Sequence, residues 1–483
     1  MSDFLSEIRK IPTCDIIRNL SYISINMFKS GKSSIPLKLL CKPKGVWTYV
    51  DIPLLAWDIP SIEFLSVKNS NDYHKSHKKP QLESLVNYYR GYENEHSAPL
   101  ENANFDTILR TILGMTSEQF IFQEQWRIFE KFNRNYHLLL AAKDYKHRGS
   151  LDINFITRET FGLSAKDYIS VLLIVFWLCT QHPDPLDAPE NLYKKNDTTI
   201  LTKENITKFV KYYSCTYEDL RKSSLGRQLL YSKPFIKTSK GTYLSSSLFL
   251  VGMIINNGLY WLARDYYLKQ KSSFFVNAFG EIFEDYIEEL ASKYWDREKW
   301  KKLPEEKEKS ADYIFDFGNL KMLIECKTSL LALDARQQVP NIANLNRFFE
   351  HTIKESYEQL NSSYSRLAPS SDVPIIKVIL LYDEFSNTNI IEKSISEIFD
   401  NDYLCYVMTI HEFEILLYSY KYYPTKREEF VAQVLQNYKC EKTQSIGSIL
   451  EALSLYNKNF HFEGDLNYFS KLLKYLGLQL KDE

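Results

Sequence analysis

Residues 311–327 read ADYIFDFGNLKMLIECK, two β-like runs that meet at the dipeptide GN of positions 318–319. A glycine-containing dipeptide between two apolar runs is typical of a two-residue hairpin turn. Phe317 and Leu320 flank this turn, and placing them opposite each other fixes the register of the whole hairpin. The large apolar residues of both strands then share one face. The sequence therefore predicts a hairpin with one apolar side.

The same register sets two carboxylates, Asp312 and Glu325, directly across from each other. Their Cβ atoms would lie about 5 Å apart, and like charges in that position destabilise a sheet unless something compensates them. A divalent cation is the natural compensator, and hard oxygen ligands suit Mg²⁺, which takes one or two carboxylates and keeps several waters. Lys327 shares their face because side chains alternate along a strand. Its ammonium could orient an attacking water or stabilise charge that develops on a phosphate.

The helix expected over residues 274–292 supplies a third candidate acid. Beside its main apolar face runs a second stripe of small and apolar residues, Gly280, Ile287 and Ala291, and Glu284 lies within this stripe. The neighbouring acids point further round toward solvent. Glu284 is therefore the acid of this helix that we expect to face inward, and Gly280 would allow close backbone approach.

The bulk composition favours a large, mostly helical chain. With 483 residues the chain is too long for one ordinary domain, and its 44% hydrophobic residues support a sizeable core. Glycine (15) and proline (16) are scarce, which disfavours a turn-dense β architecture. Lys and Arg (60) balance Asp and Glu (61), so no overall field attracts a polyanion, although a local basic groove would suffice for nucleic acid.

Apolar periodicity indicates the other elements upstream of the hairpin. Residues 44–67 could hold short strands, and residues 104–230 have a helical pattern with helices starting at Ser117 and Thr202. Residues 168–179 are the most apolar run, too short for a bilayer span of about 20 residues, so a buried core helix is expected. The charge-dense connector 296–310 is expected to be a solvated face or loop.

Downstream of the hairpin the pattern predicts a long helix, two further strands and a helical tail. Their expected bounds are 342–367 for the helix, 374–384 and 403–410 for the strands, and the residues after 422 for the tail. The resulting fold class is α+β and multidomain. The expected parts are a mostly helical recognition or regulatory region (1–265), an α/β domain (266–421) and a helical C-terminal extension (422–483).

Three of these features together resemble the PD-(D/E)xK nuclease superfamily: Glu284 on the helix, Ala311-Asp312 on the first strand and Glu325-Cys326-Lys327 on the second. The resemblance implies a restriction-endonuclease-like core built as helix, hairpin, helix and strand. It implies Asp312 and Glu325 as Mg²⁺ ligands, with Mn²⁺ able to substitute, and the backbone carbonyl of Cys326 as an extra ligand. Lys327 would be the catalytic lysine and Glu284 a supporting catalytic acid.

The match departs from the family pattern in two places. Ala311 stands where the family has proline, a common relaxation of the motif. Gln359 and Tyr364 echo residues that a later helix carries in recombination-type members, but their spacing is one residue too long, so the ordinary structural interpretation is favoured for both. A second acid-x-lysine sequence, at 305–307, lies in the charged connector without an apolar strand around it and is set aside.

The resemblance implies a Mg²⁺-dependent endonuclease that hydrolyses nucleic acid, with DNA favoured over RNA. The helical N-terminal layout also resembles uncharacterised bacterial proteins suspected in anti-phage defence. The alternative function is a catalytically silent or partner-gated protein that binds nucleic acid or acts as a scaffold. A homodimer is expected where both strands are cut, because each chain has one site, and a partner protein is the alternative partner.

The location expected from the sequence is the cytoplasm. The seven cysteines are odd in number and form no CxxC pair, which fits a reducing compartment. The first residues carry acids early and no apolar core of a signal peptide, and no membrane association is expected.

Overall fold

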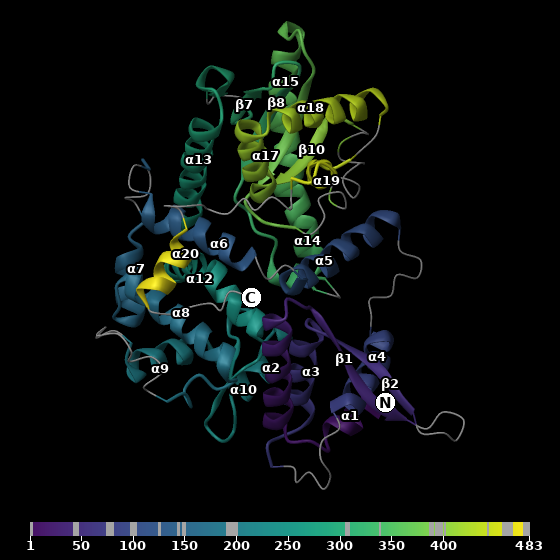
Figure 1. Ribbon diagram of the computed structural model, residues 1–483, viewed down its shortest axis with the longest axis vertical. Coiled ribbons are helices and arrows are strands. Elements are labelled where there is room, and N and C mark those ends of the chain that lie inside the picture. The colour runs from purple at the N-terminus through teal and green to yellow at the C-terminus, as the bar shows by residue number, and fades with distance from the viewer. Residues whose placement is uncertain are drawn as a thin grey trace.

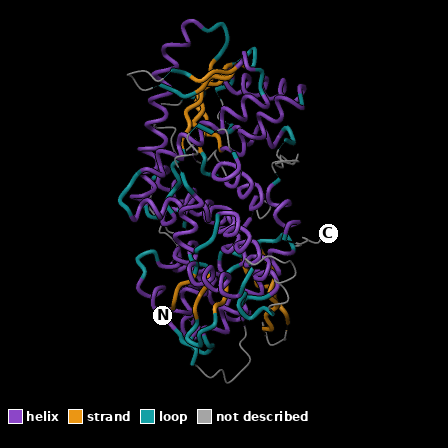
Figure 2. Tube along the Cα trace, turned by 90° about the vertical axis from the view of Figure 1, so that its left-hand side faces the viewer, coloured by secondary structure: helices purple, strands orange, loops and turns teal. Residues whose placement is uncertain are grey.

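A computed structural model of the chain describes most of its residues. The described residues are 3–41, 48–73, 82–96, 104–123, 127–142, 145–146, 151–189, 201–304, 310–337, 340–385, 391, 399, 402–441, 444–455 and 467–476. They form an elongated α+β structure in which helices surround small sheets (Figure 1). The strands gather in separate places, at the upper and lower ends of the molecule (Figure 2). The predicted α+β class is confirmed.

The lower part of the molecule holds a β-hairpin, a small sheet and most of the N-terminal helices (Figure 1). The hairpin pairs β1 (Ser34–Cys41) with β2 (Thr48–Leu55), and the small sheet has the order β3 (Ser214–Thr216), β4 (Phe235–Lys237) and β5 (Tyr243–Ser245). The helices of the N-terminal half are α1 (Asp3–Ile8), α2 (Thr13–Lys29), α3 (Asp58–Asn69), α4 (Leu82–His96), α5 (Phe105–Gln123), α6 (Arg127–Tyr136), α7 (Ile153–Phe161), α8 (Ala165–Gln181), α9 (Lys203–Tyr212), α10 (Tyr217–Lys222), α11 (Leu229–Ser232) and α12 (Leu248–Lys269).

The upper part is built around a five-stranded sheet. Its strands are β6 (Trp300–Lys302), β7 (Tyr313–Asp316), β8 (Lys321–Lys327), β9 (Ile375–Leu381) and β10 (Cys405–Thr409), hydrogen-bonded in the order β10-β9-β8-β7-β6. β6, β7 and β8 form an antiparallel ladder, whereas β8, β9 and β10 run parallel. The central strand β8 is therefore paired on both edges, which holds its side chains in a fixed register.

Helices cover both faces of this sheet (Figure 1). α13 (Phe274–Tyr294) and α17 (Ile410–Tyr422) share one apolar cluster with the side chains of one sheet face. A second cluster on the opposite face includes side chains of α14 (Ile342–Phe348) and α15 (Glu355–Leu367). A π-helical segment, Phe349–Lys354, joins these last two, so the single long helix predicted over 342–367 is present with a π-bulge in its middle.

The hairpin register predicted from the turn dipeptide is confirmed. Gly318 has a φ of +92°, a conformation that glycine adopts without strain, and its N–H donates to Asp316 Oδ1. The facing pairs of the two strands are Tyr313 with Ile324, Ile314 with Leu323, Phe315 with Met322 and Asp316 with Lys321. Tyr313, Phe315, Met322 and Ile324 are all buried on the face that α13 covers.

One local expectation is wrong, and two others hold only in part. Ser117 does not begin a helix but lies buried inside α5, because tertiary packing of that helix outweighs the capping preference of serine. Within residues 44–67, expected to hold short strands, Thr48–Leu55 form the strand β2, whereas the following segment is the helix α3. The described part of the charged connector is mostly exposed, as expected, but it also contains the strand β6, which pairs Trp300 with Phe315 and Lys302 with Tyr313. Residues 305–309, which carry the second acid-x-lysine sequence, lie outside the described residues.

Other predicted elements are confirmed. Thr202 is the N-cap of α9, and its side chain accepts from Asn205 N. The most apolar run forms α8, whose side chains are mostly buried in the core. The tail contains α18 (Pro424–Lys439), α19 (Ile446–Ala452) and α20 (Tyr468–Tyr475). α20 leaves the upper part and lies beside α6 near the middle of the molecule (Figure 1).

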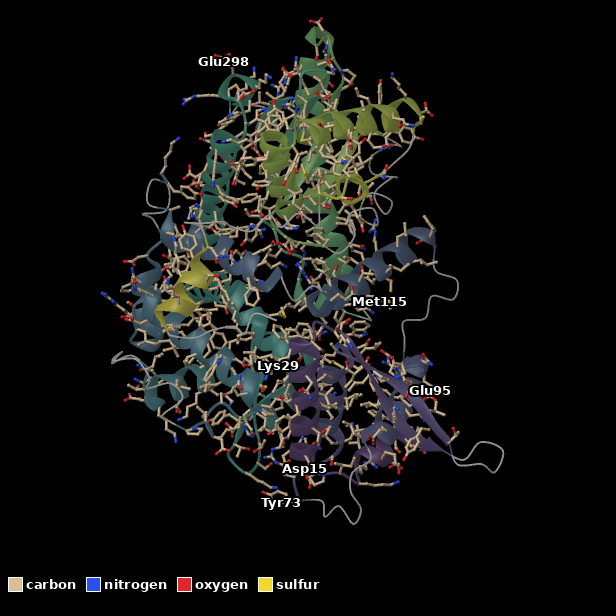
Figure 3. All side chains as sticks on the ribbon, in the orientation of Figure 1. Asp15, Lys29, Tyr73, Glu95, Met115 and Glu298 are labelled. Carbon is tan, nitrogen blue, oxygen red and sulfur yellow. The ribbon has the colours of Figure 1, made fainter. Side chains whose placement is uncertain are left out.

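Side chains cover the ribbon throughout the upper and lower parts of the molecule (Figure 3). The junction between the two parts carries a buried ionic network. Arg134 of α6 donates from Nε and Nη2 to the two carboxylate oxygens of Glu414, at 2.6 and 2.7 Å, and from Nη1 to Glu384 Oε1 at 2.7 Å. Tyr286 of α13 also donates to Glu414, at 2.7 Å. The largest apolar cluster continues across the same junction, from α8 and α12 into α13. The lower and upper parts are therefore tied by both charge and apolar contact.

Among the described helices, none is by itself both long and apolar enough to cross a membrane. α7 and α8 meet such a criterion, on length and composition, only when they are counted as one segment bent by 60°.

One buried acid in the lower part should contribute to the pH dependence of stability. Glu63 of α3 is fully buried, accepts from Ser246 Oγ, and has no hydrogen-bond partner for Oε1 among the described residues. Burial raises the pKa of Glu63 well above its ordinary value of 4.5. Unfolding therefore releases a proton above pH 4.5, so the neutral carboxyl stabilises the fold below that pH and this contribution is lost as pH rises.

We expect Glu63→Gln to raise the free energy of unfolding, by about 1–3 kcal/mol at pH 8 and by less at pH 5.5, because each pH unit between the two pKa values is worth about 1.4 kcal/mol. Urea unfolding of both proteins at the two pH values measures this difference. The exposed Glu159→Gln serves as the control and should change neither value by more than about 0.5 kcal/mol. A Glu63→Gln difference that does not grow with pH would contradict the prediction.

Candidate active site

The structure places Asp312 at the entrance of β7, opposite Glu325. Its backbone N–H donates to Ile324 O at 2.9 Å, which extends the hairpin ladder by one residue beyond the strand. Its side chain turns toward β8, where Oδ2 accepts from the backbone N–H of Cys326 at 2.7 Å. The carboxylate predicted to face Glu325 is therefore fixed in place by a backbone hydrogen bond.

Glu325 is buried in the middle of the sheet, with 2% of its surface exposed. Its Oε1 accepts from Lys327 Nζ at 2.6 Å. Its Oε2 is buried and has no hydrogen-bond partner among the described residues. An unsatisfied carboxylate oxygen in the interior is unfavourable, so this atom has an unused capacity to bind a cation or a proton.

Lys327 is held by two partners on the face of the sheet that α15 covers. Besides Glu325 Oε1, its Nζ donates to Gln359 Oε1 of α15 at 3.0 Å. Gln359 is thus part of the site, although its spacing in the sequence argued against it. Tyr364 is not: its ring contacts the ammonium of Lys377, 4.9 Å from the ring centroid.

Glu284 reaches the same region from α13 but has a partner of its own. Its Oε2 accepts from Lys302 Nζ at 2.7 Å, and the same ammonium lies 3.4 Å from Glu288 Oε1. About a third of the Glu284 side chain is exposed (32%), so it is not fully turned inward. Gly280 lies near Thr328, yet a Cβ there would be 4.0 Å from Thr328 Oγ1, an ordinary contact, so the space does not require glycine.

Cys326 packs as expected. Its side chain lies against the large apolar cluster, and burial raises the pKa of its thiol well above the ordinary value, so the thiol is unreactive. Its backbone N–H is engaged by Asp312. The use of its backbone carbonyl as a metal ligand stays a prediction.

Burial disfavours the charged form of both facing carboxyls, and the charge of Asp312 adds to this effect at Glu325. Burial raises the pKa of Asp312 to about 6, opposed by the hydrogen bond from Cys326 N and assisted by the negative charge of Glu284. Burial raises the pKa of Glu325 to about 8, assisted by the charge of Asp312 and opposed by the ammonium of Lys327. Perturbed acids that cluster with a lysine are typical of catalytic and metal-binding sites.

Asp312 and Glu325 are the two acids of the site that could hold a divalent cation. Across the described residues, no group of three His, Cys, Asp or Glu side chains is arranged to hold a metal ion by itself. Glu284, the third acid predicted for the site, is paired with Lys302. Asp312 and Glu325 remain, and Glu325 Oε2 has no hydrogen-bond partner among the described residues. Two carboxylates completed by waters fit Mg²⁺, which rarely uses an all-protein cage.

No known protein family, curated protein or solved structure matches this chain. The residues of the site and their geometry are therefore the basis on which a function can be inferred.

Two residues at the site were missed or discounted by sequence reasoning. Lys302 lies in the charged connector, and only its pairing opposite Tyr313 brings it to Glu284. A short strand of three residues with two lysines gives almost no periodic signal. Gln359 could have been found by asking which polar residue of the long helix faces the sheet, because Ser356, Leu360 and Ser363 around it are buried.

Proposed function

We propose that this protein is a Mg²⁺-dependent nuclease of the PD-(D/E)xK type, which hydrolyses phosphodiester bonds of DNA rather than RNA. The observation that carries the proposal is the buried, unpartnered Oε2 of Glu325, a residue that lies opposite Asp312 and shares its strand face with Lys327. The order α13, hairpin β7–β8, helix α14–α15 and parallel strand β9 supports a restriction-endonuclease-like core. Cytoplasmic location and a role in defence against phage are proposed on the sequence alone.

Asp312 and Glu325 would hold the metal, and bound Mg²⁺ would offset their charge and polarise a phosphodiester. The Lys327 ammonium is placed to stabilise negative charge on the phosphate or to orient the attacking water. Gln359 positions Lys327 by accepting one of its hydrogen bonds, which holds the ammonium in one orientation. Glu284 would support the site once it is released from Lys302.

The ion pair between Glu284 and Lys302 favours a gated enzyme as the second candidate function. In the structure Glu284 is engaged by Lys302, so the third acid is withheld from the pair formed by Asp312 and Glu325. A nucleic-acid strand or a partner that attracts the Lys302 ammonium would free Glu284. The variant Lys302→Met separates the two candidates, because it should raise the basal cleavage rate of a gated enzyme and leave an ungated one unchanged.

The decisive experiment incubates the full chain with supercoiled plasmid, linear DNA and RNA, in Mg²⁺, Mn²⁺ or EDTA. We expect metal-dependent cleavage of DNA that is lost in Lys327→Ala. Lys321→Ala is the matched control, because Lys321 is on the same strand and the same face but about 20 Å away. Cleavage that survives Lys327→Ala, or that persists in EDTA, would contradict the proposal.

The metal requirement should depend on pH. Because the pKa values of Asp312 and Glu325 are raised to about 6 and about 8, both carboxyls must lose protons before they bind a cation. We expect the Mg²⁺ concentration for half-maximal cleavage to fall about tenfold per pH unit from pH 6 to pH 8 and then to level off. Cleavage titrated with Mg²⁺ at each pH tests this, and a half-maximal concentration independent of pH would exclude these acids as the ligands.

A further inference from the structure

A cavity of about 430 Å³ lies in the lower part of the molecule, between the end of α9, α11 and α12. Leu333, which follows the catalytic strand β8, forms part of its wall. Its size is within the range of small-molecule sites in proteins, about 300–1,000 Å³. It is separate from the carboxylates of the candidate active site, none of which lines it.

The inner wall of the cavity is aromatic. It includes the rings of Tyr212, Tyr213, Tyr231 and Trp261. Two of the three tyrosine hydroxyls form hydrogen bonds with residues that do not line the cavity. The hydroxyl of Tyr213 lies 2.6 Å from that of Tyr168, and Tyr231 donates to Glu118 at 2.7 Å. What these residues offer an occupant is therefore ring surface. Planar aromatic groups stack favourably on such surfaces.

The mouth of the cavity is charged and carries a net positive charge. Lys233 lies there, donating to Tyr212 O at 2.6 Å, and burial lowers the pKa of its ammonium. Two exposed residues of α12, Asp265 and Lys269, also lie at the mouth, one helical turn apart. Two lysines against one carboxylate favour an anion, and Asp265 adds an acceptor for hydroxyl or amino groups. An aromatic interior behind a cationic mouth suits a ligand that joins a planar ring to an anionic group.

We propose that this cavity binds a mononucleotide, with its base against Trp261 and the tyrosines and its phosphate facing Lys233 and Lys269. The wall residue Leu333 gives the site a connection to the hairpin. Leu333 lies six residues after Lys327, and its segment is held by Leu331 N, which donates to Asp383 Oδ2 at 2.8 Å, and by Arg336, which pairs with Asp383. An occupant that contacts Leu333 orders this segment. Any effect on cleavage rests on the proposed nuclease function, whereas binding does not.

Binding is tested on the full chain by calorimetry with AMP, GMP, CMP and UMP, with the four nucleosides as probes that lack the phosphate. We expect at least one nucleotide to bind with a Kd below about 100 μM, and its nucleoside to bind at least tenfold more weakly. Lys269→Ala, at an exposed position, should weaken nucleotide binding about tenfold and leave nucleoside binding unchanged. Trp261→Leu should weaken both. The exposed Lys203→Ala, on α9 away from the cavity, is the matched control and should change neither.

The proposal is overturned if none of the four nucleotides binds at about 1 mM, or if nucleosides bind as tightly as nucleotides. Hydrogen exchange of residues 328–337 tests the connection to the hairpin without using cleavage. It should slow in the presence of the bound nucleotide and not in Trp261→Leu, and unchanged exchange in the nucleotide-bound wild type would remove the connection while leaving the binding site. A chain that binds nucleotide and cuts nothing would refute the nuclease and not the cavity.

Discussion

Glu325→Gln is expected to abolish metal-dependent cleavage and at the same time to make the fold more stable. Loss of one charged ligand at a catalytic metal, or of one group that stabilises transition-state charge, lowers turnover by at least about 10²- to 10³-fold. The stability gain has a separate cause. Burial and the charge of Asp312 raise the pKa of Glu325 to about 8, so the ionised carboxylate is unfavourable in the folded protein.

The sign of the stability change follows from the linkage between proton binding and folding. A carboxyl whose folded pKa exceeds its unfolded value near 4.5 stabilises the fold below pH 4.5, and this contribution is lost as pH rises toward 8. Glutamine has no proton to lose and no charge to oppose Asp312. At pH 8 we expect the free energy of unfolding to rise by about 1–3 kcal/mol, because lost contact between position 325 and Lys327 offsets part of the gain.

Asp316→Asn is the matched control for this substitution. Asp316 lies on the same hairpin at its turn end, and asparagine can still accept the hydrogen bond from Gly318 N. We expect its cleavage rate and stability to remain near those of the wild type. If instead Glu325→Gln cuts normally, or if it destabilises the protein by the roughly 3–5 kcal/mol typical of a broken buried ion pair, Glu325 and Lys327 form a structural pair rather than a metal site. Plasmid cleavage and urea unfolding at pH 8 make the two measurements.

Arg134→Met is expected to cause the largest loss of stability, about 3–5 kcal/mol. Arg134, Glu384 and Glu414 each have 3% or less of their side chain exposed, and removal of the guanidinium leaves two carboxylates in the interior without their main partner. Because Arg134 comes from α6 and its partners from the upper part of the molecule, the unfolding transition should also become less cooperative. Urea denaturation followed by fluorescence and by circular dichroism would show the two signals diverging.

Two further variants test whether the unpaired charges cause the loss of stability expected for Arg134→Met. Arg134→Met combined with Glu414→Gln should recover part of the loss, since one of the two carboxylate charges is gone and Tyr286 can still donate to the amide oxygen. Arg158→Met, at an exposed position on α7, should change stability by no more than about 0.5 kcal/mol. A loss below about 1 kcal/mol in Arg134→Met would show that the network contributes little to joining the two parts.

The sequence alone determined the local part of the candidate site. The turn at Gly318 and the alternation of side chains fix which residues of a hairpin face each other. The opposition of Asp312 and Glu325 and the shared face of Lys327 therefore follow from the order of residues along the chain. These residues lie within 16 positions of one another, and the period of two leaves a single register that buries the apolar side.

Tertiary structure decided everything that joins distant segments. Lys302 meets Glu284 across 18 positions, Gln359 meets Lys327 across 32, and Arg134 meets Glu414 across 280. The aromatic cavity likewise combines residues of α9, α11 and α12 with Leu333. Such contacts depend on how helices pack on the sheet and on one another, and many packings satisfy the same apolar periodicity. Hairpin register is set by neighbours along the chain, whereas these partners are set by the shape of the whole core.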